Sequence, residues 1–262
     1  MEQISIIGCG WLGTPLGEHL SNTGYDVLGS TTSENKVNEL ASLGIEPFLF
    51  KFNPMPEGEN FQKLFESKTL FINIPPRSKA QSPEFYREQI KYLKYLLSSN
   101  KTVEQVIFIS STSYYPNSNE EVNEDTTYDF ESGSNKAVVW AEQEISQIRQ
   151  KLIILRCGGL MGNSRIPGRW FAGKETSGKN NPTNYIHLDD IIKEVSQLLE
   201  LEEWPKIKNL VNPNHYPRHE VMEAMSAKYG YPPPKWKEPF KTPTKKVYSK
   251  YELRGLTDPL NY

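Results

Sequence analysis

Three glycines near the amino terminus have a spacing that suits contact with a phosphate group. Gly8, Gly10 and Gly13 form the pattern G-x-G-x-x-G directly after a β-branched run and at the start of a helix-like segment. In this pattern the first glycine permits a tight turn, the second lets the backbone approach a pyrophosphate, and the third allows close packing of helix on strand. The helix N-terminus adds amide donors and a partial positive charge. The alternative is a glycine turn that serves packing alone.

The residues around this turn complete a predicted binding site for a nicotinamide dinucleotide. Trp11 and Leu12 lie inside the glycine pattern, and Asn73, Ile74 and Pro75 close a later apolar run. The carboxyl ends of neighbouring parallel strands form the nucleotide-binding edge of such sheets. We therefore expect all five residues to contribute to the cofactor site.

The end of the second predicted strand bears on which dinucleotide binds. An acidic residue there would hydrogen-bond the ribose hydroxyls of NAD, but the sequence places Ser30, Thr31 and Thr32 at this point, with Lys36 one helical turn further on. Small hydroxyls and a cation favour the 2′-phosphate of NADP. NAD is the alternative, with Glu34 as the acid if the register differs by a few residues.

The elements that must position these residues alternate along the chain. Strand-like runs are found at residues 4–7, from 27 onward, and at 47–52, 69–74, 103–109 and 152–155. Helical spacing is found at residues 14–22, 36–43, 61–67, 83–97, 136–149, 189–199 and 219–229. Alternating strands and helices predict an α/β fold with a Rossmann-type, doubly wound parallel sheet.

Proline becomes frequent after residue 200, which indicates a small C-terminal α/β cap rather than a second independent domain. We expect residues 1–160 to form the NAD(P)-binding Rossmann domain and residues 161–262 to form a lid and cap. The last Rossmann elements, at about 184–212, are expected to interleave with this second part.

Composition excludes several classes of protein. The 262 residues carry 30 Lys and Arg against 32 Asp and Glu, a formal charge of −2, which does not suit a nucleic-acid binder. No apolar run approaches the ~20 residues of a membrane-spanning helix, and the N-terminus does not resemble a signal peptide. The two cysteines, Cys9 and Cys157, suit a reducing compartment. We expect a cytoplasmic monomer or homodimer that acts on a small molecule and contains no metal site.

Three further segments resemble one known family. The stretch Phe108–Pro116 (FISSTSYYP) resembles the fifth strand of extended short-chain dehydrogenases, Leu155–Gly162 (LRCGGLMG) resembles their "LRPGxxYG" segment, and Tyr185–Asp190 (YIHLDD) is similar to their "xIHVDD" helix start. With the glycine turn, these motifs follow the family order from Ile4 to about Tyr229. The chain thus resembles the NAD(P)-dependent epimerase/dehydratase group, in particular its atypical, nucleoside-diphosphate-sugar epimerase-like members.

The resemblance implies a catalytic set that the chain matches only in part. The family uses a Ser or Thr together with Tyr and Lys in the pattern Y-x-x-x-K. Here Ser111 matches the hydroxyl position and Lys136 the lysine, but Ser132 replaces the tyrosine. A serine hydroxyl is far less acidic than a phenol, so Ser132 does not inherit the proton-transfer role. Lys136 would still hold the cofactor ribose.

Two functions therefore stay open. The first is an NADP-dependent, epimerase-like oxidoreductase acting on a polar molecule, with sugar derivatives among the candidates; Tyr115, Tyr128 and Tyr185 are the tyrosines that would replace the missing phenol. The second is a cofactor-binding protein without hydride transfer, such as a redox sensor or a scaffold.

Six lysines gather near the carboxyl end, against the single acidic residue Glu238. They are Lys235, Lys237, Lys241, Lys245, Lys246 and Lys250. A spread of this kind is typical of a solvated surface rather than a binding site.

Overall fold

The computed structural model describes residues 2–77, 80–127 and 135–262 and divides into two compact units. Unit 1 comprises Met1–Ser110, Asn135–Leu155 and Ser196–Ile207, and unit 2 comprises Ser111–Ser134, Arg156–Val195 and Lys208–Tyr262. The chain therefore crosses between the units several times. The domain boundary expected near residue 160 stays a prediction.

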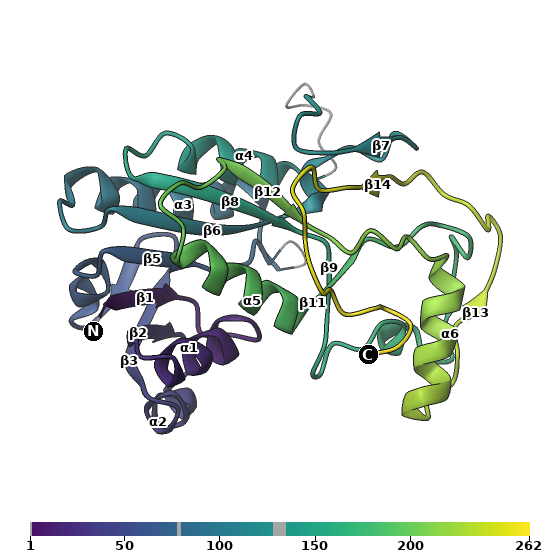
Figure 1. Cartoon of the computed structure of the whole chain (residues 1–262), viewed down its shortest axis with the longest axis horizontal. Coiled ribbons are helices and arrows are strands. Elements are labelled where there is room, and N and C mark those ends of the chain that lie inside the picture. Colours follow the sequence, from purple (N-terminus) through teal and green to yellow (C-terminus); the bar gives the residue numbers. More distant parts are fainter. Residues whose placement is uncertain (1, 78–79, 128–134) are drawn as a thin grey trace. The chain divides into compact units, whose positions relative to one another are not determined.

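An eight-stranded sheet is the main element of the fold (Figure 1). In spatial order its strands are β12 (Ile207–Leu210), β8 (Lys151–Cys157), β6 (Gln105–Ser111), β5 (Thr69–Ile72), β1 (Gln3–Ile7), β2 (Asp26–Thr31), β3 (Ile45–Phe52) and β4 (Pro56–Gly58). The pairs β5–β6, β1–β5, β1–β2 and β2–β3 are parallel, and β3–β4 is antiparallel. The predicted doubly wound α/β sheet is confirmed.

The central strands are apolar on both faces because helices cover both sides. Four of the five residues of β1 and all four of β5 are buried, the pattern of a strand inside a parallel sheet. The helices are α1 (Gly13–Asn22), α2 (Val37–Ser42), α3 (Pro83–Ser99), α4 (Lys136–Ile145), α5 (Leu188–Leu199) and α6 (Arg218–Tyr229). Figure 1 shows α3 and α4 on one face of the sheet and α1 and α2 on the other.

In unit 1, the helix predicted for residues 61–67 differs from the structure. Residues 61–67 form only a short 3₁₀ turn, η2 (Phe61–Phe65), instead of a helix. Phe61 stacks on Phe50 of β3 at 4.8 Å between ring centroids, and Leu64 and Phe65 are buried. The apolar spacing of this segment therefore reflects packing onto β3 by a single turn.

The order of the strands defines the binding edge. The chain moves from β1 outward through β2 and β3, and then returns to the other side of β1 to form β5, β6 and β8. The order thus reverses between β1 and β5, and ligands of such sheets bind at the carboxyl ends of the strands at that point. The glycine turn follows β1, and Asn73 follows β5 directly.

Unit 2 contains short parallel strand pairs, helix α6 and the first part of α5. The pairs are β9 (Gly159–Met161) with β11 (Tyr185–His187), β7 (Glu121–Val122) with β14 (Lys246–Val247), and β10 (Glu175–Thr176) with β13 (Lys235–Trp236). Buried Val221 and Met225 of α6 pack with Ile166 in a small core of their own. None of these pairs has a strong sequence signal, since each strand has only two or three residues.

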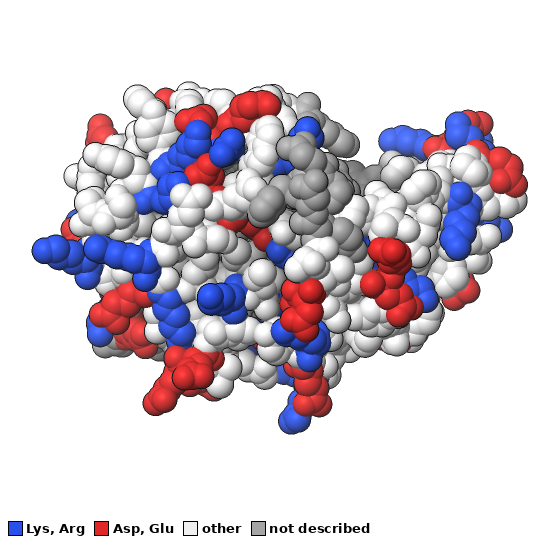
Figure 2. Space-filling model, turned by 90° about the horizontal axis from the view of Figure 1, so that it is seen from above, with Lys and Arg blue, Asp and Glu red and all other residues white. Residues whose placement is uncertain are grey.

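Charged residues of both signs are interspersed on the surface. Figure 2 shows Lys and Arg next to Asp and Glu over much of the face it draws. Within the described ranges, no helix combines the length and the apolar character needed to cross a lipid bilayer.

Candidate functional site

Two of the three motif glycines, Gly8 and Gly13, are needed by the fold itself, whether or not a ligand binds. Gly8 has a φ of +107°, and a Cβ on it would lie 2.6 Å from the Asn73 carbonyl oxygen. A Cβ on Gly13 would lie 2.3 Å from the carbonyl oxygen of Gly8. Both contacts are with backbone, so neither neighbour can move aside without disturbing the turn. These glycines bring β1, the turn and α1 close together.

Gly10 is different, because its backbone faces open space. An added Cβ would meet no heavy atom within 4 Å. Packing therefore gives no reason for glycine here, whereas a ligand lying against the backbone does. The Gly10 nitrogen donates to the Gly8 carbonyl at 2.9 Å and the Gly10 carbonyl accepts from Thr14 at 3.0 Å, which holds the turn in shape. Residues 8–13 thus fit the pyrophosphate of a dinucleotide.

The other predicted residues of the turn support its shape. Leu12 precedes α1 as its N-cap and is only 2 % exposed, so its side chain anchors the helix start in the core. Trp11 is half-buried. Asn73 donates from its side-chain amide to the Gly8 carbonyl at 3.2 Å, and its backbone nitrogen donates to Ile7 at 2.9 Å. Asn73 therefore connects the ends of β1 and β5.

Ile74 and Pro75 follow Asn73 after β5; Ile74 is half-buried and Pro75 is exposed. The carbonyl of Ile74 accepts a hydrogen bond from the Tyr86 hydroxyl at 2.8 Å, and the Ile74 side chain packs against the core. Burial raises the pKa of Tyr86, whose hydroxyl is thereby a fixed donor from α3. Helix α3 thus holds this segment in place.

The hydroxyls at the end of β2 serve the backbone. Ser30 accepts a hydrogen bond from the Gly8 nitrogen at 2.9 Å, and Thr31 accepts one from the Ser33 nitrogen at 3.2 Å. Both residues are buried, whereas Thr32 is exposed. Of the three predicted hydroxyls, Ser30 and Thr31 therefore shape the site, and Thr32 is the one open to solvent.

Lys36 lies close enough to the turn to influence it electrostatically. Burial raises the pKa of the Cys9 thiol to about 12, and the Lys36 ammonium acts in the opposite direction. Lys36 closes the short 3₁₀ turn η1 (Glu34–Lys36) that follows β2. Glu34 begins the same turn, three residues beyond the last residue of β2, and is exposed.

The predicted catalytic residues are at the ends of two elements. Ser111 is the last residue of β6, is half-buried, and accepts a hydrogen bond from the Ser113 nitrogen at 3.1 Å, which leaves its own proton to donate. Lys136 is exposed and is the first residue of α4. Ser111 belongs to unit 2 and Lys136 to unit 1, so their joint role stays a prediction. Ser132 lies outside the described residues.

Of the three tyrosines considered as replacements for the missing phenol, Tyr115 is sealed in the interior and Tyr185 is partly buried. Tyr115 is fully buried; its hydroxyl donates to Asn209 at 3.0 Å and accepts from Arg156 at 2.9 Å, and burial raises its pKa. Burial also raises the pKa of Tyr185 to about 12. Tyr128 lies outside the described residues. Tyr115 is therefore a structural residue, and Tyr185 is a poor proton donor.

A buried carboxylate beside the end of β6 was not expected from the sequence. Glu142 of α4 is 4 % exposed and accepts a hydrogen bond of 2.5 Å from Ser110, the neighbour of Ser111. Glu144 of the same helix is equally buried and is held by Arg87 and Lys94 of α3. The signal in the sequence is two acids in α4 that follow the apolar run Ala137–Ala141.

The two cysteines should be inert in the folded protein. Cys9 and Cys157 are both buried, and burial raises each thiol pKa to about 12, so almost no reactive thiolate exists at pH 8. We expect Ellman's reagent to label neither thiol quickly at pH 8, and to label two per chain after denaturation. A fast-reacting thiol in the native protein would contradict this burial.

Comparison with known proteins places this geometry in a family. No family model matches the chain. Protein YeeZ of Escherichia coli K12 is 30% identical over 240 residues, which cover 90% of this chain and 87% of that protein.

The chain belongs to the YeeZ family. Its fold is that of the extended short-chain dehydrogenases, as the sequence motifs predicted. Vestitone reductase from alfalfa superposes with a TM-score of 0.74 at 18% identity over 95% of this chain and 90% of that one. UDP-glucuronic acid 4-epimerase from Bacillus cereus, solved with UDP-glucuronic acid and NAD, superposes with a TM-score of 0.74 at 16% identity over 94% and 89%. For this member of the YeeZ family, these likenesses establish the architecture.

Proposed function

We propose that this chain binds NADP and acts as an epimerase/dehydratase-like oxidoreductase on a polar small molecule, with sugar derivatives among the candidates. The observation that carries the proposal is the open backbone at Gly10, placed at the reversal point of the sheet. Bound NADP would supply a nicotinamide ring that accepts or gives hydride. We place this activity in the cytoplasm, in a monomer or homodimer.

The chain's own residues would divide the work. The turn from Gly8 to Gly13 would bind the pyrophosphate, with Asn73, Ile74 and Pro75 forming the neighbouring wall. Lys136 would hydrogen-bond the ribose hydroxyls. Ser111, whose hydroxyl proton is available, would donate a hydrogen bond to the reacting oxygen of the substrate.

The preference for NADP over NAD rests on the charge beside β2. The strand ends at Thr31 with no carboxylate, and Lys36 is the cation that acts on the turn. A 2′-phosphate would gain a charge-assisted contact with Lys36 and with the exposed hydroxyl of Thr32. NAD would need a carboxylate at the end of β2, but Glu34 comes three residues after that end, in η1. This separation favours NADP over the alternative NAD.

Replacing Lys36 with alanine should therefore weaken NADPH binding and not NADH binding. We expect about a 10-fold loss of NADPH affinity, equivalent to about 1.4 kcal/mol, measured by calorimetric titration of both cofactors. Lys101→Ala is the matched control, because this exposed lysine precedes the amino end of β6, whereas the glycine turn follows the carboxyl end of the parallel strand β1. Equal losses for both cofactors would refute the assignment of Lys36 to the 2′-phosphate.

A second candidate function is cofactor binding without hydride transfer. The buried hydroxyl of Tyr115, which is bonded to Asn209, and the raised pKa of Tyr185 favour it, because burial raises the pKa of both phenols. A crystal structure of the NADP complex separates the two functions. A phenol within hydrogen-bond reach of the nicotinamide site supports the oxidoreductase, and its absence supports a sensor or scaffold. Failure to bind either NADPH or NADH would overturn both.

A further inference from the structure

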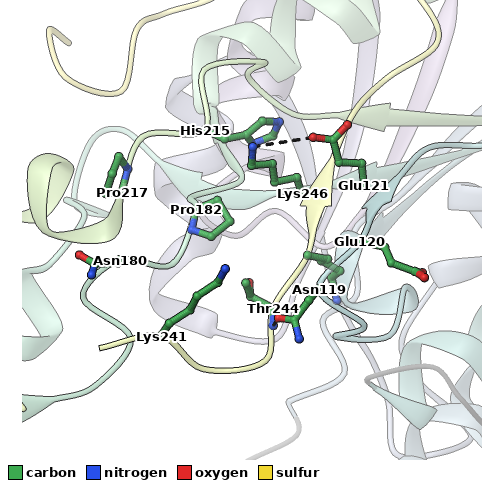
Figure 3. Close-up of a pocket in the computed structure, with 11 residues that line it drawn as sticks. Asn119, Glu120, Glu121, Asn180, Pro182, His215, Pro217, Lys241, Thr244 and Lys246 are labelled. Carbon is green, nitrogen blue, oxygen red and sulfur yellow. Dashed lines mark hydrogen bonds and ion pairs between the residues drawn. The ribbon is translucent and has the colours of Figure 1, made fainter. Parts of the chain in front are cut away.

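Unit 2 contains a pocket of about 380 Å³, lined mainly by polar and charged residues and within the size range of small-molecule sites. Its walls come from the β7 and β14 strands, the segment before β11, and the segment before α6 (Figure 3). The lining residues are Asn119, Glu120, Glu121, Asn180, Pro182, His215, Pro217, Lys241, Thr244, Lys245 and Lys246. Three of the six C-terminal lysines thus line one pocket, whereas their sequence is typical of a solvated surface.

The three lysines are not equivalent. Lys245 is buried and its amine donates to the Tyr115 carbonyl and to Asn117, which fixes it in the wall. Lys246 pairs with Glu121 at 3.7 Å. Lys241 is exposed and makes no ion pair with any residue in the described part of the chain. Figure 3 shows its amine directed toward Pro182, into the space between the lining residues.

The acidic residues do not neutralise Lys241. The carboxylate of Glu121 faces Lys246, and Figure 3 shows the side chain of Glu120 extending away from the other lining residues. Thr244 and Asn180 add a hydroxyl and an amide on the same side as Lys241. This end of the pocket is therefore suited to an anionic group.

The other end offers a hydrogen-bond acceptor. The Nδ1 atom of His215 lies 2.8 Å from the Thr183 carbonyl, which can only accept, so Nδ1 carries the proton. Burial lowers the pKa of His215 and keeps the ring neutral. Its Nε2 atom is buried and has no hydrogen-bond partner among the described residues. A buried acceptor without a donor is costly, and a ligand hydroxyl would satisfy it.

We propose that this pocket binds a small hydroxylated anion, with its anionic group at Lys241 and a hydroxyl donated to His215. A sugar phosphate and a sugar acid share this chemistry. An amino acid does not, because among the described lining residues the carboxylate of Glu121 is already paired with Lys246 and that of Glu120 extends away from the other lining residues, so an ammonium group would find no partner. The proposal rests on unit 2 alone and is independent of NADP binding.

Calorimetric titration of the full chain, without NADP, tests the proposal. The probes are glucose 6-phosphate, gluconate, inorganic phosphate and glucose. We expect a Kd below about 1 mM for glucose 6-phosphate or gluconate, and at least about 10-fold weaker binding of inorganic phosphate and of glucose. The stronger of the first two identifies the anionic group as phosphate or carboxylate.

Variants test the two contacts separately. Lys241→Met should weaken the binding of the preferred anion by about 10-fold or more, and Lys241→Glu should weaken it further. Lys235→Met is the matched control, because Lys235 is an exposed lysine of unit 2 outside the pocket. His215→Phe keeps an aromatic ring against Tyr248 and should remove the preference for the preferred anion over inorganic phosphate.

Three results would overturn the proposal. They are no measurable binding of either hydroxylated anion, unchanged binding in both Lys241 variants, and an equal loss in Lys235→Met, which would show attraction to surface charge in general. Thermal unfolding of each variant establishes that the fold is retained.

Discussion

Gly10→Ala should weaken NADPH binding by at least about 30-fold while leaving the thermal unfolding of the free protein unchanged. The added methyl group meets no protein atom within 4 Å, so the fold has no reason to respond. It does occupy the space through which a pyrophosphate would approach the backbone. The loss corresponds to about 2 kcal/mol of binding free energy. Gly10→Val, with a larger side chain, should lose more.

Titration of NADPH by calorimetry and a thermal melt of the same sample check this expectation. Cooperative melting at the wild-type temperature shows that the loss of binding is local. Unchanged affinity in both Gly10 variants would remove the main support for a dinucleotide site at this turn.

Gly13→Ala makes the same chemical change three residues later, but it should destabilise the fold, which Gly10→Ala leaves unchanged. Its methyl group would lie 2.3 Å from the Gly8 carbonyl oxygen and 3.2 Å from a methyl carbon of Ile6. Because the closest neighbour is backbone in a tight turn, α1 must shift away from β1. We expect a loss of about 2–4 kcal/mol in the free energy of unfolding, the cost of overpacking a core, and a melting temperature lower by about 5–10 °C.

The melt of the cofactor-free protein is the decisive measurement for Gly13. Gly10→Ala serves as its control, since it adds the same methyl group to the same turn. A Gly13→Ala protein that melts like the wild type would show that the close contact between α1 and the turn is not needed for stability.

Much of the cofactor site could be predicted from the sequence because it is local. Strand, glycine turn and helix follow one another within the first 22 residues, and the spacing of Gly8, Gly10 and Gly13 is a pattern of six consecutive positions, although Gly8 also needs room beside Asn73. The alternation of strands and helices then allowed few arrangements other than a parallel, doubly wound sheet. Short elements were predicted less well, as at η2, where the apolar spacing predicts a helix and the chain forms a single 3₁₀ turn.

Only the tertiary structure determined what the individual polar side chains do. The sequence predicts that Ser30 and Thr31 favour the 2′-phosphate of NADP, and the structure shows their hydroxyls accepting hydrogen bonds from the Gly8 and Ser33 backbone. Tyr115 was a candidate for the replacement phenol, but its hydroxyl donates a hydrogen bond to Asn209, which is 94 residues away in the sequence.

The lysines near the carboxyl end show the same limit. Their sequence indicates a solvated surface, whereas the fold buries Lys245 and brings Lys241 and Lys246 to a pocket with His215. The physical reason is common to these cases. A turn depends on neighbours in the chain, whereas burial, pKa and hydrogen-bond partners depend on residues that only folding brings together.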